Sequence, residues 1–116
     1  MTTELKKLVI DRSKWLRSRL GKERVDGKLL NEWGKMCCLG FDCHYLHNVP
    51  RDNLAQRHEP CTYKLPCSLN KPDQQQAIRI NDRGVGFKDI AEAEQERLIA
   101  ELFLKNGVEV IFEGEK

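Results

Sequence analysis

The chain lacks any apolar run long enough to span a bilayer, since runs such as Leu8–Ile10 and Leu102–Leu104 are far shorter than about 20 residues. Its first dozen residues contain two lysines but no apolar h-region and no small-residue cleavage site, so we expect no secretory signal. Internal repeats are also absent. These absences favour a cytoplasmic protein whose thiols stay reduced.

What remains is an ordinary globular composition of 116 residues, 40% hydrophobic and 33% charged. This length suits a single domain over residues 1–116 with one modest core. The five cysteines cannot all form pairs, and disulfides are rare in a reducing cytosol. Buried thiols or metal ligands are therefore expected in place of a disulfide framework.

Charge is unevenly distributed although the net charge is only +2. Residues 1–35 carry ten Lys and Arg against five acids, whereas residues 87–116 carry four against eight. Such an asymmetry can mark a surface for nucleic acid or an acidic partner. Mutual attraction between the two ends of one domain explains it equally well.

The clearest predicted element is a helix from Ile90 to about Lys105, followed by a C-capping Asn-Gly pair and an alternating strand over Val108–Phe112. The strand's best partner is Leu8–Ile10. Three shorter helices are expected, over residues 12–20, 36–47 and 74–80, with a single turn after Pro50 and a loop over residues 55–72. The prediction is a mainly helical α+β domain with a small sheet that pairs the N-terminal and C-terminal strands.

The segments LVIDRSKWLR, GKMCCLGF and GVEVIFE, with IND ahead of an acidic helix, resemble those of a group of small proteins from tailed phages and prophages. The resemblance covers most of the chain outside residues 55–72 and implies no particular activity. It implies an accessory protein acting in the cytoplasm of a bacterial host. His58, Cys61 and Cys67 lie outside the shared segments.

The segment from Lys35 to Pro50 concentrates three cysteines and two histidines, which are residue types that bind metal ions. Cys43 and His47 lie four residues apart, which places them on one helical face. They could bind zinc together with Cys61 and Cys67, or with His58 and Cys61. The sequence has no C-x-x-C pair, the usual basis of a zinc knuckle, and free cysteine packs well as a small hydrophobe. Buried thiols and no cofactor are therefore the favoured interpretation.

A second hypothesis is a cysteine nucleophile. Cys37 would lie near a helix N-terminus, where the helix dipole and Lys35 lower a thiol pKa, and His58 and Asn81 follow in the order of papain-like proteins. The residues around Cys37 match no nucleophile motif, and the chain is short for a substrate cleft. Close helix packing explains Cys37, Cys38 and Gly40 more simply, and we expect no catalytic residue.

A third hypothesis assigns nucleic-acid binding to the basic N-terminal third, through Arg12, Arg17, Arg19 and Lys22. A sequence pI of about 8.3 and an acidic C-terminal helix argue against a dedicated nucleic-acid binder. With the phage resemblance, the sequence favours a non-catalytic accessory protein that binds a host protein, for example as an inhibitor of a host defence system. The alternatives that stay open are a zinc-stapled nucleic-acid module and a small cysteine hydrolase.

Overall fold

The computed structural model describes residues 5–21, 28–57, 60 and 64–114. Within these residues it has an α+β fold made of two strands, four α-helices and two short helices of other types. Strands β1 (Lys6–Asp11) and β2 (Val108–Glu113) pair in parallel, with Leu8 opposite Val110 and Ile10 opposite Phe112. The predicted fold class and the predicted pairing of the two terminal strands are both confirmed.

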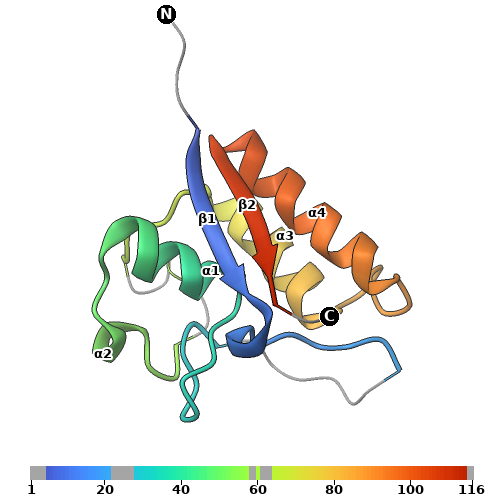
Figure 1. The fold of residues 1–116 in the computed structure, drawn as a ribbon, viewed down its shortest axis with the longest axis horizontal. Helices are drawn as coiled ribbons and strands as arrows, with labels where there is room; N and C mark the ends of the chain where they lie inside the picture. The colour runs from blue at the N-terminus through green and yellow to red at the C-terminus, as the bar shows by residue number, and fades with distance from the viewer. Residues whose placement is uncertain (1–4, 22–27, 58–59, 61–63, 115–116) are drawn as a thin grey trace, which may run out of the picture.

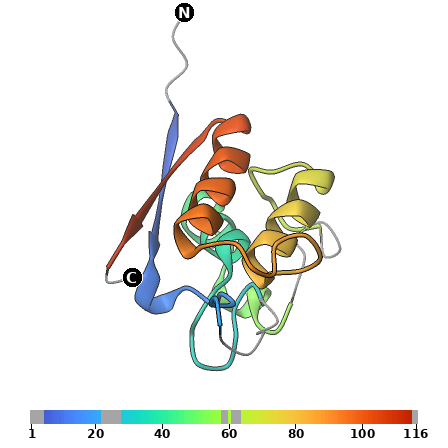
Figure 2. The same ribbon diagram turned by 90° about the vertical axis from the view of Figure 1, so that its right-hand side faces the viewer.

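The sheet has one covered and one open face because successive side chains along each strand point to opposite faces. Leu8, Ile10 and Val108 are buried, whereas Val9 and Ile111 remain exposed. Figure 1 shows β1 and β2 side by side, with α4 (Glu92–Lys105) on the side of β2. In Figure 2 the two strands stand at one side of the molecule, α4 lies next to them, and α3 (Lys71–Asp82) lies on the far side of α4. The core therefore lies between the sheet and these helices.

The end of α4 was predicted well, and its start was not. The helix ends at Lys105 before Asn106, and Gly107 adopts the left-handed φ of +82° that lets the chain turn directly into β2. The predicted start at Ile90 is two residues too early. Ile99 and Phe103 are fully buried, whereas Leu98 and Leu102 pack only partly against the core.

Helix α3 is longer than the predicted segment of residues 74–80. Asn70 caps its start by accepting a hydrogen bond from the Asp73 amide, and Pro72 lies in the first turn, where a missing N–H costs nothing. The helix ends where Arg83 adopts a left-handed φ of +56°. The prediction treated Pro72 as part of the preceding loop, although proline is favoured at this position.

The helix predicted over residues 12–20 is wrong. Only a 3-10 turn forms, η1 (Arg12–Lys14), and the chain then runs extended. The four residues from Trp15 to Ser18 are all buried, which a helix with one apolar face would not allow. Their backbone bonds run to distant segments: Leu16 N donates to Met36 O, and Ser18 N donates to Asn81 O.

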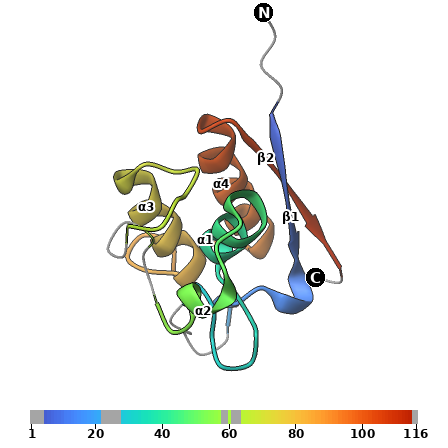
Figure 3. The ribbon, with the colours of Figure 1, turned by 90° about the vertical axis from the view of Figure 1, so that its left-hand side faces the viewer.

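The cysteine-rich segment is helical, as predicted, but it changes type. It begins as α1 (Cys38–Phe41), widens into a π-helix, η2 (Asp42–Leu46), and is followed by the single turn α2 (Arg51–Leu54). A Cβ on Gly40 would lie 2.0 Å from the carbonyl oxygen of Leu29. The predicted role of Gly40 in close packing is thus confirmed. Figure 3 shows α1 beside β1, with α2 below it.

Candidate functional site

Two side chains of the cysteine-rich segment lie close to a third cysteine from a later loop. Asp42 and Cys43 begin η2, and Cys67 comes from the loop that precedes α3. One ligand atom from each of these residues lies within 4.8 Å of the other two. Asp42 and Cys43 are fully buried, and Cys67 is partly buried.

Ser68 and His47 complete this group through the Asp42 carboxylate. The Ser68 backbone N–H donates to Asp42 Oδ2 at 2.7 Å, and the Ser68 hydroxyl donates to Oδ1 at 2.6 Å. His47 Nε2 lies 3.0 Å from the Ser68 hydroxyl and 3.5 Å from Asp42 Oδ2. We call Asp42, Cys43, His47, Cys67 and Ser68 the cysteine–aspartate cluster.

The two thiols of the cluster interact directly. A side-chain hydrogen bond with Cys67, together with burial, raises the pKa of Cys43 above that of an ordinary cysteine. At neutral pH the Cys43 thiol is therefore protonated in the absence of a metal ion. A metal that binds there must displace that proton.

The predicted zinc ligands are thus partly brought together. Cys43 and Cys67 are neighbours, and His47 contacts the carboxylate of Asp42, which lies beside both thiols. Cys61 and His58 lie outside the described residues. Sequence reasoning missed Asp42, because an acid next to a cysteine in a helix looks like a solvent-exposed position. Only its complete burial identifies it.

The structure does not favour Cys37 as a nucleophile. Burial raises the pKa of Cys37 to about 12, the opposite direction from the predicted lowering. Asn81 is engaged in structural hydrogen bonds: its side-chain oxygen accepts from Trp15 Nε1 at 2.7 Å and from the Cys38 N–H at 3.2 Å. Its amide nitrogen donates to the Leu16 carbonyl. These bonds join residues 15–16 to α1 and α3.

The basic residues proposed for nucleic-acid binding pair with α4 instead. Arg12 donates to both carboxylate oxygens of Glu96, at 2.8 and 2.7 Å, and Arg17 donates to the same carboxylate at 3.2 Å. Arg19 binds Glu92 through two bonds of 3.0 Å. We call these five residues the arginine–glutamate network.

The part of the network around Glu96 is substantially buried, whereas Arg19 is exposed. Arg17 is 8% exposed, and its guanidinium lies 4.4 Å from the centre of the Trp15 ring. Burial opposes ionisation of Glu96, but the bonds and charges of Arg12 and Arg17 together hold its pKa below the ordinary value. Glu96 is the acceptor that joins the two arginines. Lys22 lies outside the described residues.

An open groove of about 400 Å³ lies beside the outward-facing side of β1. Its apolar lining comes from both β1 and the α1–η2 segment, and its rim carries charges of both signs. The lining residues are Lys7, Val9, Asp11, Lys14, Phe41, Tyr45, Leu46 and Glu113. We call it the β1 groove.

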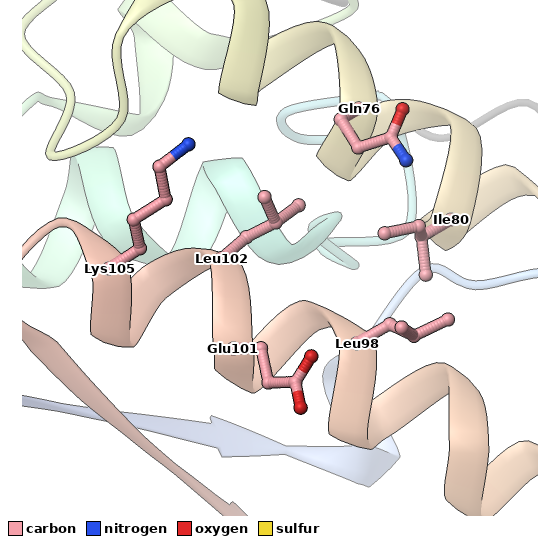
Figure 4. Close-up of a pocket in the computed structure, with 6 residues that line it drawn as sticks. All are labelled: Gln76, Ile80, Leu98, Glu101, Leu102 and Lys105. Carbon is pink, nitrogen blue, oxygen red and sulfur yellow. The ribbon is translucent and has the colours of Figure 1, made fainter.

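A smaller groove of about 240 Å³ separates α3 from α4 (Figure 4). Leu98 and Leu102 of α4 project toward Ile80 and Gln76 of α3. Its two leucines already pack partly against the core.

Within the described part of the chain, no helix is both long and apolar enough to cross a membrane. Comparison of the chain with protein-family models, curated proteins and solved structures finds no match.

Proposed function

We propose that the chain is a non-catalytic accessory protein of phage or prophage type, which acts in the bacterial cytoplasm by binding an extended segment of a host protein in the β1 groove. The observation that carries this proposal is the exposed apolar lining of the groove. Val9 is 42% exposed and Tyr45 is 49% exposed, and the two side chains line the same groove. Contiguous apolar surface with a polar rim is typical of a protein-binding site.

An extended occupant suits the groove because β1 is paired with another strand at one edge only, among the described residues. Among the described residues, β1 forms ladder pairs with β2 only, which leaves its other edge available to a further strand. Lys7, Val9 and Asp11 occur in the order basic, apolar, acidic along the open face. An antiparallel partner segment with an acid opposite Lys7 and a base opposite Asp11 would match these charges.

A second copy of this chain offers the same charge pattern, but it fits less well. Pairing two β1 edges would also bring two η2 walls into one groove, because Tyr45 and Leu46 line the groove alongside Val9. A single extended segment brings no such wall. Arg12, Arg17 and Arg19 are engaged with α4, so a nucleic-acid partner gains no support from these three residues.

The test is capture from bacterial host lysate, with and without nuclease, by the wild-type chain and by two variants. Tyr45→Glu places a charge in the groove, and Leu104→Glu is the matched control, because Leu104 is 53% exposed on α4 and outside the groove. A photo-crosslinking residue at position 45 identifies the captured segment. We expect nuclease-resistant capture by wild type and by the control, and at least a roughly tenfold loss with Tyr45→Glu.

Equal capture by both variants would refute the groove as the binding site, and loss on nuclease treatment would refute a protein partner. Light scattering during gel filtration tests for a second copy. A dimer that Tyr45→Glu dissociates would reassign the groove to self-association and overturn the host-protein proposal.

A further inference from the structure

The Asp42 side chain is buried without a Lys or Arg partner among the described residues. It is 0% exposed, and no Lys or Arg among the described residues forms an ion pair with it. Its contacts are the Ser68 N–H, the Ser68 hydroxyl and His47, whose imidazole is cationic only when protonated. Burying an ionised carboxylate is costly unless a cation or several hydrogen bonds compensate it. A bound cation would be the charged partner that this side chain lacks among the described residues, and the ligand atoms of Cys43 and Cys67 lie within 4.8 Å of it.

The groups around this carboxylate are suited to one kind of cation. Two thiols, one imidazole and one carboxylate form a mixed sulfur, nitrogen and oxygen donor set, which zinc accepts and which magnesium and calcium do not. We propose that Cys43, Cys67, Asp42 and His47 bind a structural zinc ion. This inference does not rest on the binding function proposed above.

Three of the four donors, those of Asp42, Cys43 and Cys67, require only local adjustment. Tetrahedral zinc bonds of roughly 2.0–2.3 Å place neighbouring ligand atoms about 3.3–3.8 Å apart. The donor atoms of Asp42, Cys43 and Cys67 already lie within 4.8 Å of one another. His47 lies outside this three-residue group: its Nε2 is 3.5 Å from Asp42 Oδ2 and would leave its 3.0 Å contact with the Ser68 hydroxyl to reach the metal. Each bound thiol loses its proton to solvent.

Ser68 has a distinct role in this site. Its N–H and hydroxyl bind the two oxygens of Asp42 and orient the carboxylate, as outer hydrogen bonds do for metal ligands generally. Four protein ligands close the coordination sphere and leave no position for substrate, so the zinc is structural. It would tie the loop before α3 to η2, and Tyr45 and Leu46, between the helical ligands, would be held in place.

The test is metal analysis of protein purified without metal-affinity resin or chelator. Elemental analysis should give about one zinc per chain for wild type and for His44→Ala. His44 is the matched control, because it lies in the same π-helix and bonds to the Val49 carbonyl. Cys67→Ser and His47→Ala should each lose at least about nine-tenths of the metal, because losing one ligand opens the site.

A second readout does not depend on the variants folding. Wild-type chain refolded with Co²⁺ should show the intense ligand-field absorption of a tetrahedral thiolate site, with a titration endpoint near one equivalent. Folded wild type that contains no zinc and gives no such cobalt spectrum would overturn the proposal. Retention of full zinc by Cys67→Ser, or a mass showing a Cys43–Cys67 disulfide in the purified protein, would overturn it as well.

Discussion

The arginine–glutamate network and the cysteine–aspartate cluster are both polar groups at the core, but they differ in how buried charge is compensated. In the network, Glu96 meets two arginines from the opposite end of the chain. In the cluster, buried Asp42 meets a hydroxyl, a backbone N–H and an imidazole. The network needs nothing from outside the chain. Among the described residues, the cluster places no Lys or Arg against Asp42, and a metal ion would be its charged partner.

The largest effect we expect is at Gly40, next to the cluster. In Gly40→Ala, the new Cβ would lie 2.0 Å from the Leu29 carbonyl oxygen, so backbone must move. We expect a loss of about 3 kcal/mol or more in the free energy of unfolding, measured by urea denaturation. Gly84→Ala is the control, because its Cβ would lie an ordinary 3.6 Å from Arg79. Similar losses in the two variants would show that α1 is less tightly packed than described.

The next effect tests the network. Glu96→Gln removes the carboxylate and leaves the buried Arg17 without its partner. We expect a loss of about 2–4 kcal/mol in unfolding free energy, somewhat below the usual cost of breaking a fully buried pair. Glu101→Gln, whose partner Arg97 is exposed, should cost less than about 0.5 kcal/mol. Equal costs would mean that the network is no more important than a surface ion pair.

The secondary structure was predictable wherever it depends on residues close together in the sequence. Alternation along Val108–Phe112 and the apolar triplet at Leu8–Ile10 predicted the sheet, and the Asn-Gly pair marked the end of α4. Trp15, Leu16 and Leu20 occur at spacings compatible with a helix, which explains the error there. The extended course of this segment depends on Met36 and Asn81, which are distant in sequence.

The candidate site was predictable only in part, for the same reason. Cys43, His47 and Cys67 could be chosen from residue type and spacing. Asp42 and Ser68 could not, because their importance arises from a contact between a helix and a loop 26 residues away. Attraction between the basic and acidic ends of the chain was one of two predictions, the other being a binding surface. No local sequence pattern could decide between them.

A smaller effect concerns pH. The hydrogen bonds and the charge of Arg19 hold the pKa of Glu92 below its ordinary value. Although burial opposes this shift, the pKa of Glu96 is also lowered, by Arg12 and Arg17. A lowered folded-state pKa means that the unfolded chain binds more protons, so the stabilisation is complete above about pH 4.5 and is lost as pH falls further. The stability difference between wild type and Glu96→Gln should therefore shrink below that pH. A difference that stays constant down to pH 3 would contradict the sign of this shift.

Arg12, Arg17 and Arg19 of the basic N-terminal region serve the fold by pairing with α4. The most direct measurement is a double-mutant cycle of Arg12→Gln and Glu96→Gln on unfolding free energy, with Arg12 bound to both carboxylate oxygens and both side chains 11% exposed. We predict a coupling energy of about 1–3 kcal/mol that changes little between low and high salt. A coupling energy indistinguishable from zero would show that the pair does not stabilise the fold, and these arginines would then be candidates for binding a partner.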